Sequence, residues 1–145
     1  MSHSPPNVVW IIPNPDTDTY RVLADISLDL APYMPGGGPR VMGESVPLMI
    51  KIPAGFETDG ASIPRPFWLT TGTPFRPRFF KSALIHDYLY RHQILERSLV
   101  DQIFREMLLA DGVCKYTAIK MYYALRLAGW IAWNRHRRRL AKSAE

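Results

Sequence analysis

The sequence predicts an α+β fold, with a small antiparallel β-sheet in the N-terminal half and three helices in the C-terminal half. All 13 prolines precede Arg78, so the residues that break helices are confined to the first half. Short apolar runs there alternate with turn-forming residues, whereas long apolar runs fill the second half. No internal repeat is evident. We therefore expect one domain over 1–145, rich in strands and loops over 7–78 and helical over 79–140.

Three segments of the first half are predicted strands. NVVWIIP (7–13) is apolar, ends in proline, and is followed by the turn-forming NPDTD. TYRVLADISLDL (19–30) alternates in part and predicts a half-buried strand, although a helix from Leu23 onward is also compatible with the pattern. SVPLMIKIPAGFETD (45–59) resumes a strand, in which Pro47 favours an edge position.

Residues 59–78 form the predicted loop between the two halves, because they show no periodicity and contain several prolines. A loop of this length inside a compact domain is usually functional or packed. We therefore expect Asp59, Ser62 and Arg65 to lie over a site. An Asx-type turn that only holds the loop also explains Asp59, and Ser62 lacks the strand–turn–helix context of a nucleophile elbow.

Three helices are predicted over about 79–92, 97–111 and 116–140. Ser98 is the expected N-cap of the second helix, and Gly112 is its expected C-terminal stop. The connection between the first two helices is short, so these helices are expected to be antiparallel neighbours.

Polar residues in the first two helices form the candidate site. His86 and Tyr90 are four residues apart on one face of an otherwise apolar helix, and Asp87 points about 100° away. Asp101 adjoins the apolar stripe of the next helix. Across antiparallel helices, Asp101 would accept from one ring nitrogen of His86 and leave the other nitrogen as a base. A buried pair that only locks helix register explains the same residues, so both roles stay open.

The net charge of +5 is concentrated in a basic tail, residues 134–145. Five cations against Glu145 give this tail +4. Its cations are Arg135, Arg137, Arg138, Arg139 and Lys142. A solvated helix end is the simplest role. The first alternative is contact with anionic lipid, in which Trp130 and Trp133 would lie at the interface. The others are contact with nucleic acid and contact with an acidic protein surface.

Other features limit the class of protein. The single cysteine, Cys114, excludes an internal disulfide framework and a cysteine-based zinc site, and it is expected to be buried near a helix start. The N-terminal segment has no signal-peptide pattern. No uncharged run reaches the roughly 18 residues that span a bilayer, since the best segment, 121–133, contains Arg126.

Four ordered segments carry a family resemblance: GFETDGASIPR (55–65), ALIHDYLY (83–90), VDQIFREMLLADGV (100–113) and MYYALRLAGW (121–130). Together they resemble a phage and prophage family catalogued as domain of unknown function 1353. The resemblance implies a bacteriophage or prophage source, often near particle-structure genes. We therefore expect a structural and interaction protein of the tail or head–tail region that contacts other phage structural proteins. Its expected location is the virion, or the host cytoplasm during assembly.

A second, narrower resemblance rests on His86-Asp87-x-x-Tyr90 followed by Asp101-x-x-Phe104. This pattern is similar to the paired-helix site of secretory and parvoviral phospholipases. It implies that His86 activates water, that Asp87 binds calcium, and that Asp101 orients the histidine with support from Tyr90. The glycine-rich calcium loop of those enzymes is replaced here by TTGTPFRPRFF, with one glycine. A calcium-dependent, phospholipase-like hydrolase is therefore the alternative function, and otherwise no cofactor is expected.

Overall fold

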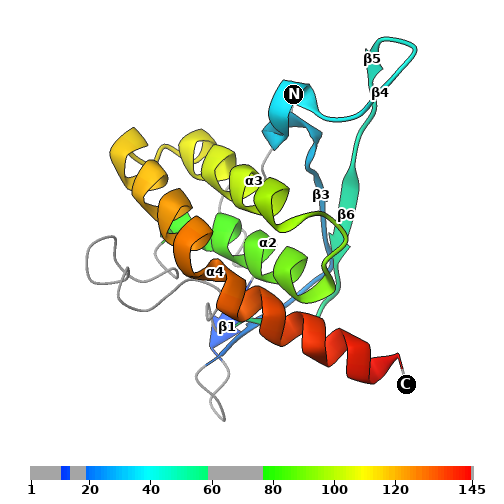
Figure 1. Ribbon diagram of the computed structural model, residues 1–145, viewed down its shortest axis with the longest axis vertical. Coiled ribbons are helices and arrows are strands. Elements are labelled where there is room, and N and C mark those ends of the chain that lie inside the picture. Colours follow the sequence, from blue (N-terminus) through cyan, green and yellow to red (C-terminus); the bar gives the residue numbers. More distant parts are fainter. Residues whose placement is uncertain (1–10, 14–18, 59–76, 145) are drawn as a thin grey trace.

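The computed structural model describes residues 11–13, 19–58 and 77–144, and it confirms the predicted α+β class (Figure 1). Its strands are β1 (Ile11–Pro13), β2 (Tyr20–Val22), β3 (Ile26–Asp29), β4 (Arg40–Val41), β5 (Glu44–Ser45), β6 (Met49–Ile52) and β7 (Glu57–Thr58). Two short 3-10 helices follow β3, η1 (Ala31–Tyr33) and η2 (Pro35–Gly37). The long helices are α2 (Pro77–His92), α3 (Arg97–Ala110) and α4 (Lys115–Ser143).

The described strands form three small antiparallel sheets instead of one sheet. The orders are β1-β2-β7, β3-β6 and β4-β5. The strand predicted over 19–30 is therefore divided, with β2 and β3 in different ladders, and the helix considered from Leu23 does not form. Between β2 and β3, Asp25 accepts a hydrogen bond from the backbone N–H of Ala54 at 2.8 Å. Such a side-chain bond to the backbone replaces ladder bonds and lets the chain change direction.

Strands and helices share their buried apolar core. One cluster joins β2, β3 and β6 to the helices, and it includes Val22, Ile50, Ile52, Leu84, Leu89, Val100, Ile103 and Met107. A second cluster lies between the three helices, and it includes Phe79, Phe104, Leu108, Met121 and Leu125. α2 and α3 thus bury apolar residues on two sides, one packed against the strands and the other packed against α4.

The helix ends depart from the predictions at two residues. α3 begins at Arg97, and its N-cap residue is Glu96, which makes no side-chain cap bond. The prediction of Ser98 as the N-cap is therefore wrong, because Ser98 lies within the first turn. Gly112 has a φ of +83°, a left-handed conformation that favours glycine after a helix, as predicted. Cys114 is exposed, which contradicts its expected burial, because it precedes α4 at the surface.

The three long helices pack side by side (Figure 1). α2 and α3 run antiparallel, as predicted, and α4 contacts both of them. α4 extends through the predicted basic tail to Ser143, so the basic residues belong to a continuous helix. None of the helices in the described part of the chain is long and apolar enough to cross a membrane.

Candidate functional site

Asp101 lies at the centre of a buried polar network where α2, α3 and α4 meet. The side chains of Asp101 and His86 are both 0% exposed. Nε2 of His86 lies 3.0 Å from Oδ1 of Asp101, and the hydroxyl of Tyr90 donates to the same oxygen at 2.6 Å. The structure therefore brings together the three residues that the sequence singled out as His, acid and supporting tyrosine.

Two arginines that the sequence analysis did not place in the site bind the other oxygen of Asp101. Nη1 of Arg126, from α4, donates to Oδ2 at 2.9 Å. Nη1 of Arg97 lies 3.7 Å from Oδ2 and donates to the backbone carbonyl of Leu125 at 3.0 Å. One carboxylate thus joins side chains from all three long helices.

The network keeps Asp101 ionised. Burial by itself would raise the pKa of Asp101, but the hydrogen bonds and charge of His86, with the bonds from Tyr90 and Arg126, outweigh burial and lower it. The pKa of Tyr90 is raised, first by burial and then by the neighbouring Asp101 carboxylate. At neutral pH, Tyr90 is therefore a neutral hydroxyl that donates to a carboxylate, which is a strong, charge-assisted hydrogen bond.

The ring of His86 uses only one of its nitrogens within the described part of the chain. Nδ1 is buried and has no hydrogen-bond partner among the described residues. The ring centroid lies 4.1 Å from that of Tyr90 and 4.9 Å from that of Phe104, so aromatic side chains enclose it. In the neutral form of the ring with its proton on Nε2, Nδ1 carries a lone pair. The orientation is that of a general base, but the burial keeps Nδ1 from solvent.

Asp87, the calcium ligand implied by the phospholipase resemblance, takes part in a different interaction. Its side chain is 2% exposed, and its Oδ2 lies 3.1 Å from Nη2 of Arg91, one turn further along α2. No group of three or more histidine, cysteine or acidic side chains in the described segments is placed to hold a metal ion. Calcium needs six to eight oxygen ligands, so the described residues do not by themselves fit a calcium site.

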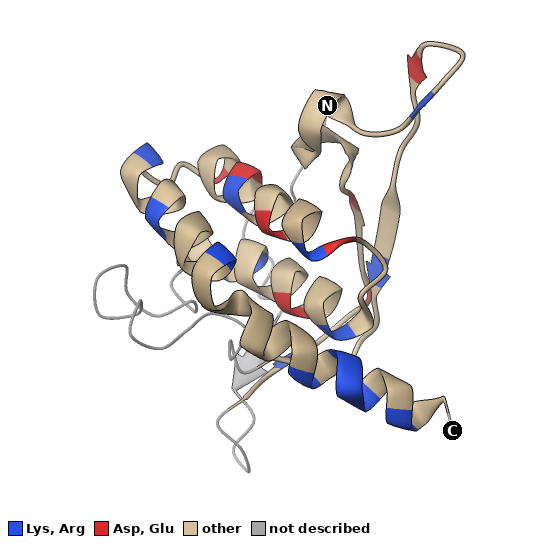
Figure 2. Ribbon diagram, viewed as in Figure 1, with Lys and Arg blue, Asp and Glu red and all other residues tan. Residues whose placement is uncertain are grey.

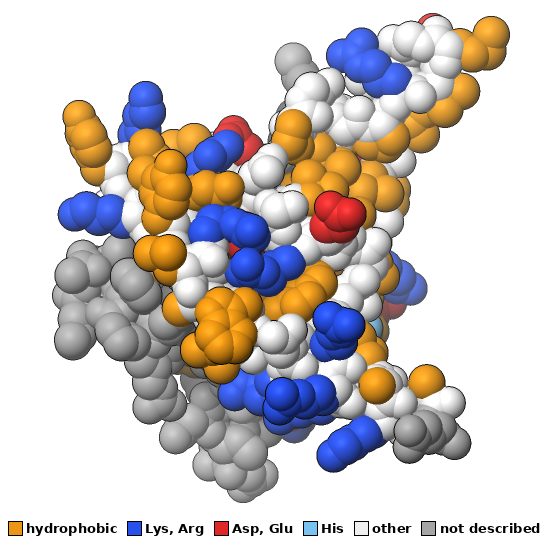
Figure 3. Space-filling view, in the orientation of Figure 1, with side chains coloured by type: hydrophobic (Ala, Val, Ile, Leu, Met, Phe, Trp, Pro, Cys, Tyr) orange, Lys and Arg blue, Asp and Glu red, His pale blue; other side chains and the backbone are white. Residues whose placement is uncertain are grey.

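The remaining predicted residues fall into two groups. Asp59, Ser62 and Arg65, expected to cover the site, lie outside the described residues. Arg135, Arg137, Arg138 and Arg139 are exposed on the C-terminal part of α4. Figure 2 shows this part of α4 as a run of basic positions, and Figure 3 shows basic side chains beside apolar ones along the same helix.

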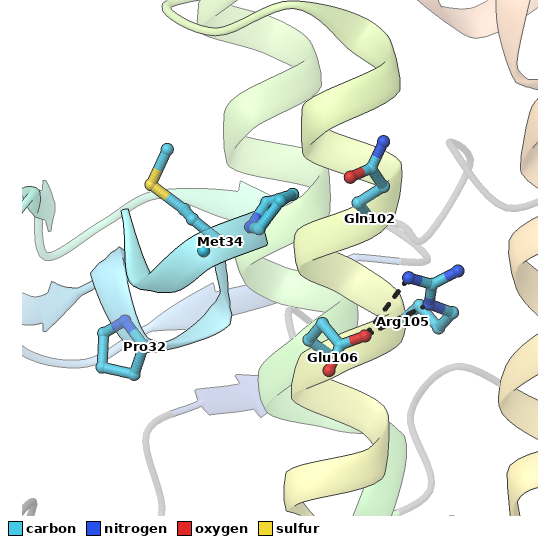
Figure 4. A pocket seen from close by; sticks show the side chains of 7 residues that line it. Pro32, Met34, Gln102, Arg105 and Glu106 are labelled. Atoms are coloured by element: carbon cyan, nitrogen blue, oxygen red, sulfur yellow. Dashed lines mark hydrogen bonds and ion pairs between the residues drawn. The ribbon is translucent and has the colours of Figure 1, made fainter. Parts of the chain in front are cut away.

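A surface hollow of about 300 Å³ lies between the 3-10 helices and α3 (Figure 4). It is lined by Pro32, Met34, Pro35, Gly36, Gln102, Arg105 and Glu106. Nη2 of Arg105 lies 3.2 Å from Oε1 of Glu106, and the guanidinium lies over the ring of Tyr122 at 4.8 Å. The charges of the lining therefore compensate each other, and no residue of the Asp101 network contributes to this hollow.

Residues 40–125 match the profile of the family described as "Protein of unknown function (DUF1353)". The chain belongs to the DUF1353 family. The matched region contains His86, Tyr90, Arg97 and Asp101, and it ends one residue before Arg126. The family region therefore includes the helix pair of the network together with the strands β4 to β7, whereas β2 and β3 precede it.

Two curated relatives come from Sinorhizobium fredii (strain NBRC 101917 / NGR234). The "Uncharacterized protein y4jT" is 35% identical over 78 residues, which are 54% of this chain and 23% of that protein. The "Uncharacterized protein y4iH" is 30% identical over 73 residues, which are 50% of this chain and 30% of that protein. The matched part of this DUF1353 chain thus spans less than a third of the length of either relative. No solved structure matches the chain significantly.

Proposed function

We propose that this DUF1353 protein is a structural and interaction protein of a bacteriophage or prophage particle, in the tail or head–tail region. The observation that carries the interaction role is the complete burial of Asp101, whose two oxygens accept from side chains of α2 and α4. A carboxylate buried in this way ties the helices together. The resemblance of four segments to phage and prophage proteins supports the particle setting.

The proposed role requires a rigid body that presents fixed surfaces. His86 and Tyr90 extend from α2, and Arg126 extends from α4, so a shift of either helix would break bonds to Asp101. Breaking one partner of a buried ion pair is costly, which favours a single helix register. The β4-β5 hairpin projects from this body, and Met42 at its tip is 99% exposed (Figure 1). An exposed hairpin on a rigid support suits contacts with other particle proteins.

Purified particles test the proposal. Particles are prepared from a phage or induced lysogen that carries the gene, and their proteins are identified by mass spectrometry. We expect the protein in particles from the parent strain, and we expect a gene deletion to reduce assembled particles. Absence of the protein from particles that assemble and infect normally contradicts the proposal.

Complementation separates the interaction role from catalysis. A plasmid copy with His86→Gln keeps a side chain that donates to Asp101 but removes the ring base. If the network acts as a lock, this variant restores particle yield to near the wild-type level. Failure to restore yield, with the variant folded and present in particles, favours a chemical role for His86.

One observation favours the calcium-dependent hydrolase as the second candidate. The bond from Nε2 of His86 to Asp101 leaves Nδ1 without a partner among the described residues, as an activated base requires. The test is release of fatty acid from phospholipid vesicles, with calcium and with a chelator. Activity that depends on calcium, is lost in His86→Gln and persists in His92→Gln would establish this function. An absence of cleavage by the folded protein in both conditions excludes it.

A further inference from the structure

α4 carries apolar residues on two opposite faces. One face is buried against α2 and α3, and it includes Ala118, Met121, Leu125, Gly129 and Ala132. The opposite face exposes five large apolar residues, each with 52–77% of its surface accessible: Tyr116, Tyr123, Leu127, Trp130 and Ile131. A helix that packs on one side of a globular protein usually has a polar outer face. The outer face of α4 therefore needs an explanation beyond folding.

These five residues form one continuous stripe, here called the outer α4 stripe. Tyr116, Tyr123 and Trp130 follow each other at intervals of seven residues. Leu127 lies between Tyr123 and Trp130, and Ile131 follows one turn after Leu127. At 1.5 Å per residue, the stripe extends for about 22 Å along the helix. Figure 3 shows apolar side chains along α4 with basic ones between them. Large exposed apolar patches on a protein commonly mark an interaction surface.

Charge identifies the kind of partner. α4 contains no acidic residue, and its cations are Lys115, Lys120, Arg126, Arg135, Arg137, Arg138, Arg139 and Lys142. Two copies of α4 packed stripe to stripe would bring cations together at both ends, in a parallel or an antiparallel arrangement. Self-association through this face is therefore disfavoured, and an anionic partner is favoured.

A shallow hollow continues the stripe toward the C-terminus. It has a volume of about 230 Å³ and is lined by Asn134, Arg137, Arg138 and Ala141. Arg137 and Arg138 are exposed, so their guanidinium groups are accessible to a phosphate. Arginine binds phosphate through paired N–H groups. An apolar stripe followed by a two-arginine hollow matches a ligand with acyl chains and phosphate groups side by side.

We propose that the outer α4 stripe binds the surface of an anionic phospholipid bilayer. Leu127, Trp130 and Ile131 enter the boundary between headgroups and acyl chains, and Arg137 and Arg138 contact lipid phosphates. A nucleic acid would use the arginines but would leave the aliphatic side chains without a partner. A lipid surface is a ligand that the proposed particle role does not require, so the two proposals stand or fall separately.

The second tryptophan is not part of this surface. Trp133, expected at a lipid interface together with Trp130, is half-buried, and its ring packs edge-on against Tyr90 with centroids 5.2 Å apart. Its backbone carbonyl accepts a hydrogen bond from Nε2 of Gln93 at 2.7 Å. Trp133 therefore belongs to the core beside the Asp101 network, and the lipid contact depends on Trp130.

Vesicle flotation with the full chain tests the proposal. One vesicle type is phosphatidylcholine alone, and the other is phosphatidylcholine mixed with phosphatidylglycerol. We expect binding to the mixed vesicles, little binding to phosphatidylcholine, and weakening as salt is raised. No binding to the mixed vesicles at low salt overturns the proposal.

Two double variants separate the apolar contribution of the outer α4 stripe to vesicle binding from non-specific hydrophobic binding. Leu127→Ser with Trp130→Ser removes two exposed apolar groups from the stripe, and we expect binding to weaken at least about tenfold. Val41→Ser with Met42→Ser removes two exposed apolar groups from the β4-β5 hairpin and should leave binding unchanged. Equal losses in both double variants contradict a site on α4.

A second pair tests the position of the charge. Arg137→Gln with Arg138→Gln and Arg135→Gln with Arg139→Gln make the same change in net charge on the same helix. Arg135 and Arg139 lie about 100° or more around the helix from the centre of the stripe. We expect at least about tenfold weaker binding for the first pair and less than about threefold for the second. Equal effects, or tight binding to duplex DNA without binding to vesicles, overturn the proposal.

Discussion

The hydroxyl oxygen of Tyr90 lies 2.6 Å from the position that a Cβ atom would occupy on Gly129. α4 therefore passes α2 at a residue without a side chain, and the same hydroxyl reaches Asp101 at 2.6 Å. Gly129 lies inside a regular helix, so its backbone conformation does not call for glycine. Glycine is needed because the Tyr90 hydroxyl occupies the space of a methyl group.

Gly129→Ala is expected to destabilise the protein by about 1–3 kcal/mol, because the new methyl group displaces the Tyr90 hydroxyl from Asp101. In a Tyr90→Phe background the hydroxyl is absent, and the nearest remaining atoms are Nη1 of Arg97 at 3.3 Å and Cζ of the ring at 3.6 Å. The Arg97 contact is with the end of a long side chain, which can shift by a few tenths of an ångström. There, Gly129→Ala should be close to neutral, or stabilising by up to about 1 kcal/mol from helix propensity. Urea unfolding of the four proteins measures this coupling, and additive effects would contradict it.

Asp101→Asn is expected to cost about 3–5 kcal/mol of unfolding free energy, because the amide keeps the shape but leaves Arg126 and Arg97 without a negative partner. Asp111→Asn is the matched control. Burial raises the pKa of Asp111, so its charge is already disfavoured in the folded state, and its replacement should change stability little. Urea unfolding at neutral pH measures both variants. Similar losses of unfolding free energy in the two variants would contradict a particular contribution of the Asp101 ion pairs to stability.

The pairing of His86 with Asp101 could be predicted from the sequence because the short connection after α2 returns α3 alongside it. The approach of Arg126 could not, since it depends on how closely α4 packs, and Gly129 sets that distance. A signal was nevertheless present. A lone arginine in the apolar segment 121–133 indicates a cation with a buried partner, because an unpaired charge is rarely placed in such a helix.

The class of the fold and the number of long helices could be predicted from the sequence. Helical periodicity over 14 residues or more is a strong signal, and α3 and α4 begin within one residue of the predicted starts. The strands are two to four residues long, so periodicity carries little information there. At the division of 19–30, Asp25 accepts a hydrogen bond from the backbone N–H of Ala54, a contact between residues distant in sequence.

Acid should destabilise the protein through Asp101. The pKa of Asp101 is lower in the folded protein than in the unfolded chain, where aspartate titrates near pH 3.9, so unfolding takes up a proton. The contribution of ionised Asp101 to the free energy of unfolding is fully present above about pH 5. It is lost as the pH falls through about 4 toward the pKa of Asp101 in the folded protein. Urea unfolding between about pH 6 and pH 3 measures this loss.

Asp101→Asn should show a smaller decline over that interval. Asp25→Asn is the control, since the pKa of Asp25 is also lowered, by its bonds to Ala54 and Lys51, but at an exposed site. A decline in Asp101→Asn as steep as in the wild type would show that this carboxylate does not carry the acid sensitivity.

A second loss of stability is expected near neutral pH, through His136. Burial is the largest cause that lowers the pKa of His136, and the cations Arg91, Arg135 and Arg139 act in the same direction, while Asp87 opposes them. In the unfolded chain histidine titrates near pH 6.5, so unfolding takes up a proton as the pH falls through that value. The free energy of unfolding should therefore decrease from about pH 7.5 to pH 5.5.

His136→Gln removes this proton uptake, so the variant should lose less stability than the wild type over the same interval. His92→Gln is the matched comparison. Burial also lowers the pKa of His92, with Arg91 contributing, but His92 is exposed whereas His136 is almost fully buried. The effect of His92→Gln should therefore be the smaller of the two, because water screens and solvates its charge. Urea unfolding at several pH values measures the slopes, and an unchanged slope in His136→Gln contradicts the assignment of the near-neutral transition to this residue.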